Sequence, residues 1–337
     1  MSIPVVYSST DAGAPTFIPD DQTTWLALIK QCLVYGYTGK AAAGWTLAYE
    51  DTVAHTLVLQ QGTGNKRYLW LGSPGYINNG GAQDIRYLVA QSYLYMTGIN
   101  SGTGMYPGVN NTNWWSFANQ YNATSTVSQK WVIVATSKFF LVYLYPTQTW
   151  SGDGYKPKIV YMFGDFKSNV NGDTYNTILT GYSAALGGYN GCFTQGTNTD
   201  MSPFNWGVGS TTPPNGAAWL AGPYYQQLGI LTSPRIYAEN TIEAGTYPGN
   251  GQNFFPDFCS NQLKLSGLKI QEFWNGTMSA RGTLPGIYVS CFSPEHLDGT
   301  VISGTGDLAG NSFLVLNNPY GGYTWPVLYI QLTSWND

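Results

Sequence analysis

Two almost continuous apolar runs, separated by only three residues, constrain the fold of this chain more than any other feature. The runs are Trp131–Ala135 and Phe139–Tyr145. Apolar runs of this length without alternation are typical of strands that are buried on both faces. We therefore expect the two runs to be neighbouring strands in the middle of a sheet, with Lys158–Phe163 as a third strand beside them.

A segment near the N-terminus shows helical periodicity instead. Its apolar residues recur at three- and four-residue spacing and are Trp25, Leu28, Ile29, Cys32 and Leu33. Asp20, Asp21 and Thr23 precede them and supply acids and a cap for a helix N-terminus, while Gly36 is a plausible stop. The pattern predicts an amphipathic helix that packs its apolar stripe on a sheet.

The rest of the chain indicates further strands. Trp45–Glu50 and Val53–Gln60 have the pattern of a hairpin, and Ser312–Leu316 is expected to pair with Val327–Leu332. Gly, Asn, Thr, Pro and Tyr dominate from Lys167 to Arg281, which predicts a loop-rich β region. The expected fold class is α+β and mainly β, with an antiparallel or mixed sheet. We expect an α+β domain over 1–166 and a loop-rich β domain over 167–337, with a single domain as the alternative.

The surface implied by the composition is unusually poor in charge. Only 9% of the 337 residues are charged, against roughly 25% in an average soluble domain. Tyr is frequent instead, with 26 copies, and there are 12 Trp. Interface cores are depleted in charged residues and enriched in Tyr and Trp. This composition favours an assembly subunit or a binding surface, and the net charge of -4 argues against nucleic acid as a partner.

The sequence carries no sign of secretion, membrane insertion or a cofactor. The opening residues lack the basic and apolar regions of a signal peptide, and the longest apolar run is too short for a membrane helix. The four cysteines are too far apart for a zinc site. We expect no cofactor, no bound metal, no membrane partner and free thiols.

Candidate catalytic groups are few. The two histidines are His55, expected within a strand, and His296, expected in a loop, and no GxSxG motif accompanies them. Asp153, Asp165 and Asp173 could form a glycosidase pair or a Ca²⁺ site, although acids beside glycines are more often turn residues. No convincing catalytic constellation results, so we expect a protein that is not an enzyme.

Aromatic residues in polar, Gly- or Asn-rich surroundings are the remaining candidate site. The interface or glycan-stacking candidates are Trp114, Trp115, Trp206, Phe254, Phe255 and Trp274. Such side chains could stack on sugars, anchor contacts with neighbouring subunits, or fill local cores under long loops.

Several segments together resemble a family of tailed-bacteriophage and prophage proteins. The resemblance rests on Val6–Pro15 (VYSSTDAGAP), Leu28–Tyr37, Gly44–Thr46 (GWT), Phe163–Phe166 and Arg281–Tyr288 (RGTLPGIY). It covers the first 50 residues best and does not extend through the region between Lys167 and Arg281. Members of the family often have Arg at the position of Ser8, which is a minor departure. The family offers no catalytic motif to carry over.

The resemblance implies a structural component of a tailed phage virion, more specifically of the tail, baseplate or neck. Such a subunit would assemble in the host cytoplasm and bind other virion proteins and copies of itself. It could instead be a capsid decoration or head-fibre protein, a receptor- or glycan-binding tail protein whose partner is a host-surface glycan, or a virion-associated glycan hydrolase.

Overall fold

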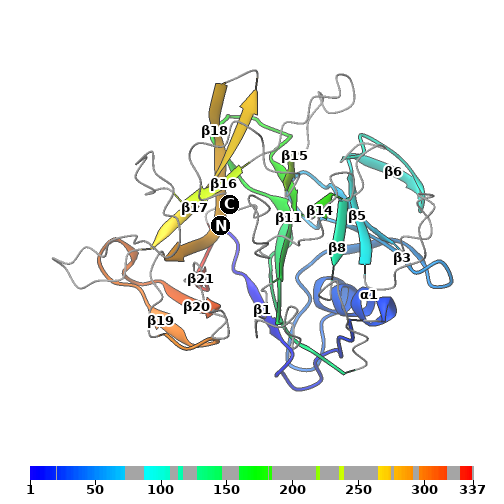
Figure 1. The fold of residues 1–337 in the computed structure, drawn as a ribbon, viewed down its shortest axis with the longest axis horizontal. Coiled ribbons are helices and arrows are strands. Elements are labelled where there is room, and N and C mark those ends of the chain that lie inside the picture. Colours follow the sequence, from blue (N-terminus) through cyan, green and yellow to red (C-terminus); the bar gives the residue numbers. More distant parts are fainter. Residues whose placement is uncertain are drawn as a thin grey trace, which may run out of the picture.

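The structure is mainly β and contains several antiparallel sheets (Figure 1). The computed structural model describes residues 1–19, 21–72, 87–106, 113–116, 127–145, 159–180, 182–183, 218–220, 235–238, 265–274, 277–290, 296–316 and 327–335. Much of the region expected to be loop-rich therefore lies outside the described residues. Among the described residues, no helix combines the length and apolar character needed to span a bilayer.

The first sheet contains the two apolar runs. In spatial order its strands are β1 (Val5–Ser8), β9 (Lys130–Ala135), β10 (Phe139–Tyr145), β11 (Ile159–Asp165), β13 (Thr177–Thr180) and β15 (Ala218–Leu220). The expected pairing of the two runs as central strands, with the third strand beside them, is confirmed. Alternate side chains of β10 are buried on opposite faces: Phe140 lies against Trp115, whereas Phe139 lies against Trp335.

The second sheet is built mostly from the N-terminal part of the chain. Its strands are β14 (Tyr182–Ser183), β8 (Asn113–Ser116), β5 (Tyr87–Tyr93), β4 (Tyr68–Gly72), β3 (Thr56–Gln60) and β2 (Thr46–Asp51). The expected hairpin is confirmed as the antiparallel pair β2–β3. A separate two-stranded ribbon is formed by β6 (Tyr95–Gly98) and β7 (Ser101–Thr103).

The third sheet is formed by the C-terminal part. Its path is β16 (Arg235–Ala238), β17 (Ser266–Trp274), β18 (Thr277–Ser290), β21 (Val327–Gln331), β20 (Ser312–Leu316) and β19 (Val301–Ser303), and β12 (Lys167–Ser168) also pairs with β18. The expected pairing of the last two runs is confirmed by β20–β21. In Figure 1 the strands of the first sheet stand between the other two sheets.

One helix lies near the N-terminus. Helix α1 (Gln22–Lys30) continues into a short π-helical segment (Gln31–Tyr35), and Gly36 follows with a positive φ of 73°. The Asp21 carboxylate caps the helix by accepting a hydrogen bond from the Thr23 N–H (2.9 Å). The predicted apolar residues of this segment are buried, and the Trp25 ring contacts the Trp115 ring of β8 at 6.3 Å between centroids.

The expected boundary at 166/167 falls within a sheet. Strand β11 on one side of it pairs with β13 on the other. One continuous core contains residues from all three sheets, among them Phe140, Leu59 and Ile330. The ends of the chain also meet, because Ser2 and Trp335 exchange two backbone hydrogen bonds (3.2 and 2.8 Å). Figure 1 shows the two termini side by side.

Candidate functional site

Trp115 was expected to be an interface or glycan-stacking residue, and the structure corrects this expectation. Its side chain is fully buried, and its ring stacks on Tyr161 at 5.0 Å between centroids. Its indole N–H donates to the Thr180 carbonyl (2.7 Å). The error arises because successive side chains of a strand alternate between its two faces, and sequence composition does not show which face is buried.

The other five aromatic candidates stay predictions. Trp114 is opposite Val89 in the β5–β8 pair, and Trp274 is opposite Thr277 in the β17–β18 pair. Their side chains are outside what the structure describes, and the remaining candidates, Trp206, Phe254 and Phe255, lie outside the described residues altogether.

Asp165, a member of the expected acidic group, is held by a buried polar network. One carboxylate oxygen accepts hydrogen bonds from the Gln61 amide (3.0 Å) and the Thr177 hydroxyl (2.6 Å). The other oxygen accepts the backbone N–H of Asn65 (2.7 Å). Gln61 and Asn65 belong to the loop between β3 and β4 of the second sheet, whereas Asp165 ends β11 of the first sheet. The carboxylate therefore links the two sheets by hydrogen bonds.

The environment of Asp165 is not that of a solvent-facing catalytic acid. Only 5% of the residue is exposed. Burial raises the pKa of its carboxyl group, and the three hydrogen bonds together with the nearby Arg67 guanidinium act in the opposite direction. The loop approaches so closely that a Cβ at Gly64, where φ is +72°, would lie 2.2 Å from the carboxylate. The side chain therefore connects two sheets.

Asp173 is similarly engaged. Its carboxylate forms an ion pair with Arg281 of β18 (2.9 Å), and only 4% of its side chain is exposed. It also accepts hydrogen bonds from the Ser168 hydroxyl (2.7 Å) and from the backbone N–H of Tyr175 (2.9 Å). The last contact is that of a turn acid, because Asp commonly binds the backbone two residues further on. Asp153 lies outside the described residues.

The two histidines do not form a catalytic pair with these acids. His55 was expected within a strand, but it lies in the turn between β2 and β3 with a positive φ of 49°. His296 contacts Tyr329, with 3.4 Å between its Nδ1 and the Tyr hydroxyl. No group of three or more potential metal ligands occurs in the described part of the chain.

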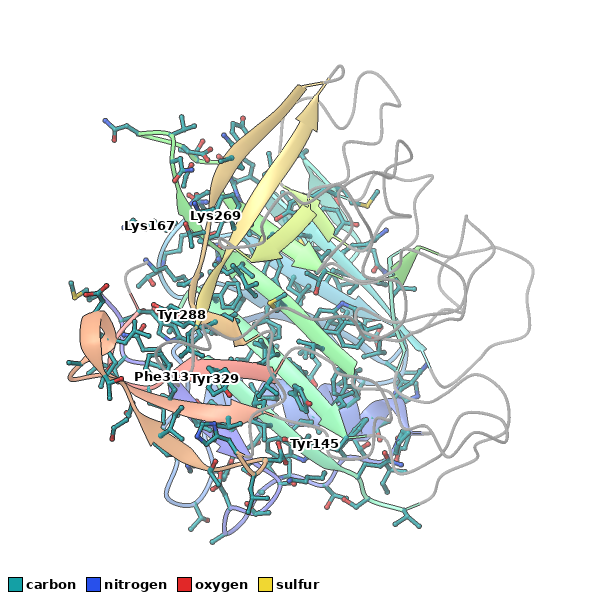
Figure 2. The ribbon with its side chains drawn as sticks, turned by 60° about the vertical axis from the view of Figure 1, so that its left-hand side comes forward. Tyr145, Lys167, Lys269, Tyr288, Phe313 and Tyr329 are labelled. Atoms are coloured by element: carbon teal, nitrogen blue, oxygen red, sulfur yellow. The ribbon has the colours of Figure 1, made fainter. Side chains whose placement is uncertain are left out.

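A second polar cluster holds the segment that precedes β19. Asp298 accepts a hydrogen bond from the Tyr145 hydroxyl (2.8 Å) and forms an ion pair with Lys130 (2.8 Å). The Lys130 ammonium also lies 4.3 Å from the centre of the Tyr145 ring. Burial raises the pKa of the Tyr145 hydroxyl, and its neighbours Tyr143 and Asp298 raise it further. Tyr145, labelled in Figure 2, is the last residue of β10. Through its bond to Asp298 the cluster joins the first sheet to the segment that leads into β19.

Strand β19, at the edge of the third sheet, is the candidate functional site. Within the part of the chain that the structure describes, no strand pairs with its outer side. Val301 is 58% exposed and Leu297, just before the strand, is 74% exposed. An open strand edge presents unpaired N–H and C=O groups that can pair with another chain. We name Val301, Ile302 and Ser303, with their outward backbone groups, the β19 edge.

The outer edge of β1, by contrast, is occupied by the chain's own side chains. Lys40 donates to the Val6 carbonyl (2.8 Å), and Asp11 accepts the Ser8 N–H (2.8 Å). The backbone N–H of Asp11 donates to the Ser8 carbonyl as well (3.0 Å). These contacts use the backbone groups that another strand would need.

The outer edge of β2 is protected in a different way. The ladder between β2 and β3 is interrupted by an irregularity between Leu47 and Tyr49. Farther along β2, Glu50 forms an ion pair with Lys30, and Asp51 follows it. Bulges and charged side chains are the usual devices that prevent strand addition. Val301, Ile302 and Ser303 carry neither, because their side chains are uncharged and their register with β20 is regular. The strand is short, with three residues, and just before it Gly299 and Thr300 both bond the backbone of Val315.

Sequence reasoning missed the β19 edge. No strand was predicted over Val301–Ser303. The one available signal was the β-branched pair Val301–Ile302 between Gly299 and Gly304. A two-residue signal of this kind is too short to predict a strand, because strands are usually recognised from four or more alternating residues.

Comparison with known proteins does not place the chain in a family. No protein-family model matches it, and no curated protein matches its sequence. Its function therefore has to be inferred from its own residues.

Proposed function

We propose that the protein is a structural component of a tailed phage virion, in the tail, baseplate or neck, and that it acts through contacts with other protein subunits. The single observation that carries this proposal is the β19 edge, which is open while the β1 and β2 edges are occupied or protected. An open edge is a liability for a lone soluble protein and a binding element for an assembly subunit.

The composition supports the same proposal. A chain with 9% charged residues has little of the charge that keeps monomers apart, and it is rich in the Tyr and Trp that subunit interfaces use. The resemblance of the N-terminal segment to phage proteins is a further, independent reason. A capsid decoration or head-fibre protein would need the same kind of contacts and differs only in its location.

A glycan hydrolase and a glycan-binding protein receive less support from the described residues. A glycan hydrolase would need exposed acids, but Asp165 and Asp173 are buried and bound by protein groups. A glycan-binding protein would need exposed aromatic rings, but Trp115 is a core residue. Asp153 remains the candidate for the hydrolase. The candidates for glycan binding remain Trp114, Trp206, Phe254, Phe255 and Trp274.

The proposal predicts that the chain is a stoichiometric part of intact particles. Particles would be purified by density gradient from a strain that carries this gene and quantified by mass spectrometry. We expect the chain to band with the major capsid and tail proteins, at a copy number that fits ring symmetry. Recovery only in the soluble fraction would contradict the proposal. Incubation of the purified chain with host-surface polysaccharide and peptidoglycan is the matched control, and we expect both polymers to remain intact.

A further inference from the structure

We propose that the β19 edge pairs with the β19 edge of a second copy of this chain, so that the third sheets of two subunits become one antiparallel sheet across a two-fold axis. This inference rests on the proposed function in one respect, because it assumes that the chain acts through contacts between subunits. It goes further by naming the partner, the strand and the register.

The backbone groups available for pairing follow from the ladder on the inner side. The Gly304 N–H donates to the Asn311 carbonyl, and the Val315 N–H donates to the Thr300 carbonyl (both 2.8 Å). Inward- and outward-pointing residues alternate along an antiparallel strand. Ile302 therefore points its backbone groups at β20, while Val301 and Ser303 point their N–H and C=O groups away from the sheet. Two copies related by a two-fold axis can then exchange about four hydrogen bonds.

The register follows from the positions of these outward groups. When Val301 of one copy lies opposite Ser303 of the other, the two Ile302 residues face each other across the axis. Ile302 is half-buried and packs on an apolar cluster that includes Phe313 and Tyr329. Two acidic residues flank the strand, Asp298 and Asp307. In this register neither of them lies opposite the same residue of the second copy.

The β19 edge is also preorganised, because contacts within the chain fix its conformation without a partner. Figure 2 shows Tyr288, Phe313 and Tyr329 grouped on the third sheet next to β19, and the Tyr288 and Phe313 rings meet edge to face at 5.5 Å. The Asp298 contacts with Lys130 and Tyr145 fix the segment that leads into the strand. A strand fixed in advance loses less conformational entropy when it binds.

A second copy is the partner that the described edges favour. Strand pairing between copies needs an open edge on both. The edges of β1 and β2 are closed by Lys40, Asp11 and the Glu50 region, while β14, β15 and β16 stand at the remaining sheet ends. A two-fold axis lets the β19 edge of a second copy serve as the open counterpart. The β19 edge is uncharged, so two copies of it meet without repulsion between like charges.

Sedimentation velocity on the purified full-length chain tests this pairing. We expect wild type to form dimers, and Val301→Lys and Ser303→Pro to shift the population to monomers with little change in unfolding temperature. The Ser303 N–H points outward, so proline there removes a bond to the partner and none to β20. Val53→Lys is the matched control, since Val53 is 90% exposed in the turn after β2, and it should leave the dimer intact. A monomeric wild type, or dimers that survive both variants, would overturn the inference.

Disulfide trapping tests the register. In the proposed pair the two Ile302 Cα atoms would be about 4.5 Å apart, within the roughly 4.4–6.8 Å that disulfides span. We expect Ile302→Cys to give a covalent dimer under mild oxidation, with Val53→Cys and wild type as references for background. Absence of that dimer would contradict the register. If the chain is present in particles but neither assay gives a dimer, this inference fails and the proposed function stands. If the dimer forms but particles lack the chain, the proposed function fails instead.

Discussion

Replacing Trp115 by alanine is expected to cost about 3–5 kcal/mol of unfolding free energy, the usual range for deleting a buried Trp. The ring is fully buried, stacks on Tyr161 and meets Trp25 and Phe140 edge to face. Its loss opens a cavity where the helix, the first sheet and the second sheet meet. Urea unfolding followed by fluorescence and circular dichroism measures the effect.

Trp115→Phe is the matched variant for this position. It keeps an aromatic ring but leaves the Thr180 carbonyl without the indole N–H that it accepts at 2.7 Å. We expect a smaller loss, about 1–2 kcal/mol, typical of removing one partner from a buried hydrogen bond. An unfolding midpoint of Trp115→Ala equal to that of wild type would show that the ring does not support the core.

Replacing Asp165 by alanine is expected to destabilise the fold by about 3 kcal/mol or more. The carboxylate accepts hydrogen bonds from Gln61, Thr177 and the Asn65 N–H, and its removal leaves these donors buried without their acceptor. The contact between the β3–β4 loop and β11 should loosen first. Hydrogen exchange should therefore show faster exchange at Asn65 than in wild type, alongside a lower urea midpoint.

An exposed acid gives the matched control for Asp165. Asp307 lies on the surface in the short 3₁₀ turn after β19, and Asp307→Ala should change stability by no more than about 0.5 kcal/mol. Equal losses of unfolding free energy from Asp165→Ala and Asp307→Ala would show that the change in net charge causes the loss and that the polar network does not stabilise the fold.

The titration of Asp165 makes a separate prediction about pH. Burial raises its pKa in the folded state above the ordinary value of 3.8. The folded state therefore binds the proton more tightly than the unfolded state does. The contribution of this proton binding to the free energy of unfolding is complete below pH 3.8, and it is lost as pH rises through the folded pKa. Asp165→Asn does not titrate. The stability of wild type relative to this variant should fall as pH rises through that window, and a constant difference would contradict the assigned direction.

The core was predictable because its signal is continuous. Trp131–Ala135 and Phe139–Tyr145 contain no charged residue and no Ser, Thr, Asn or Gln that would mark a solvent face, and every residue in them is buried except the half-buried Tyr145. The pairing of Ser312–Leu316 with the last strand was predictable for another reason, because the last run alternates and a Pro- and Gly-containing turn segment separates the two runs. The helix was predictable from its 3.6-residue period, and its N-cap, Asp21, is one of the three residues that the sequence offered for its N-terminus.

The candidate site was not predictable in the same way. Whether a Trp stacks on a ligand or fills a core depends on which face of its strand is covered, and Trp115 shows no sequence feature that tells the two apart. Whether an edge strand is open depends on groups far away in sequence: Lys40 closes the edge of β1 at Val6, 34 residues earlier. The sequence around Val301 does not show whether a distant side chain bonds the outer backbone groups of β19, as Lys40 does for β1.

Cryo-electron microscopy of intact particles from a strain carrying this gene tests the central claim most directly. The claim is that the chain is a virion subunit that works through protein contacts. It predicts density for the three sheets in the tail, baseplate or neck, with the outer side of β19 covered by a strand of a neighbouring subunit. Particles that are complete and infectious without density for this chain would contradict it.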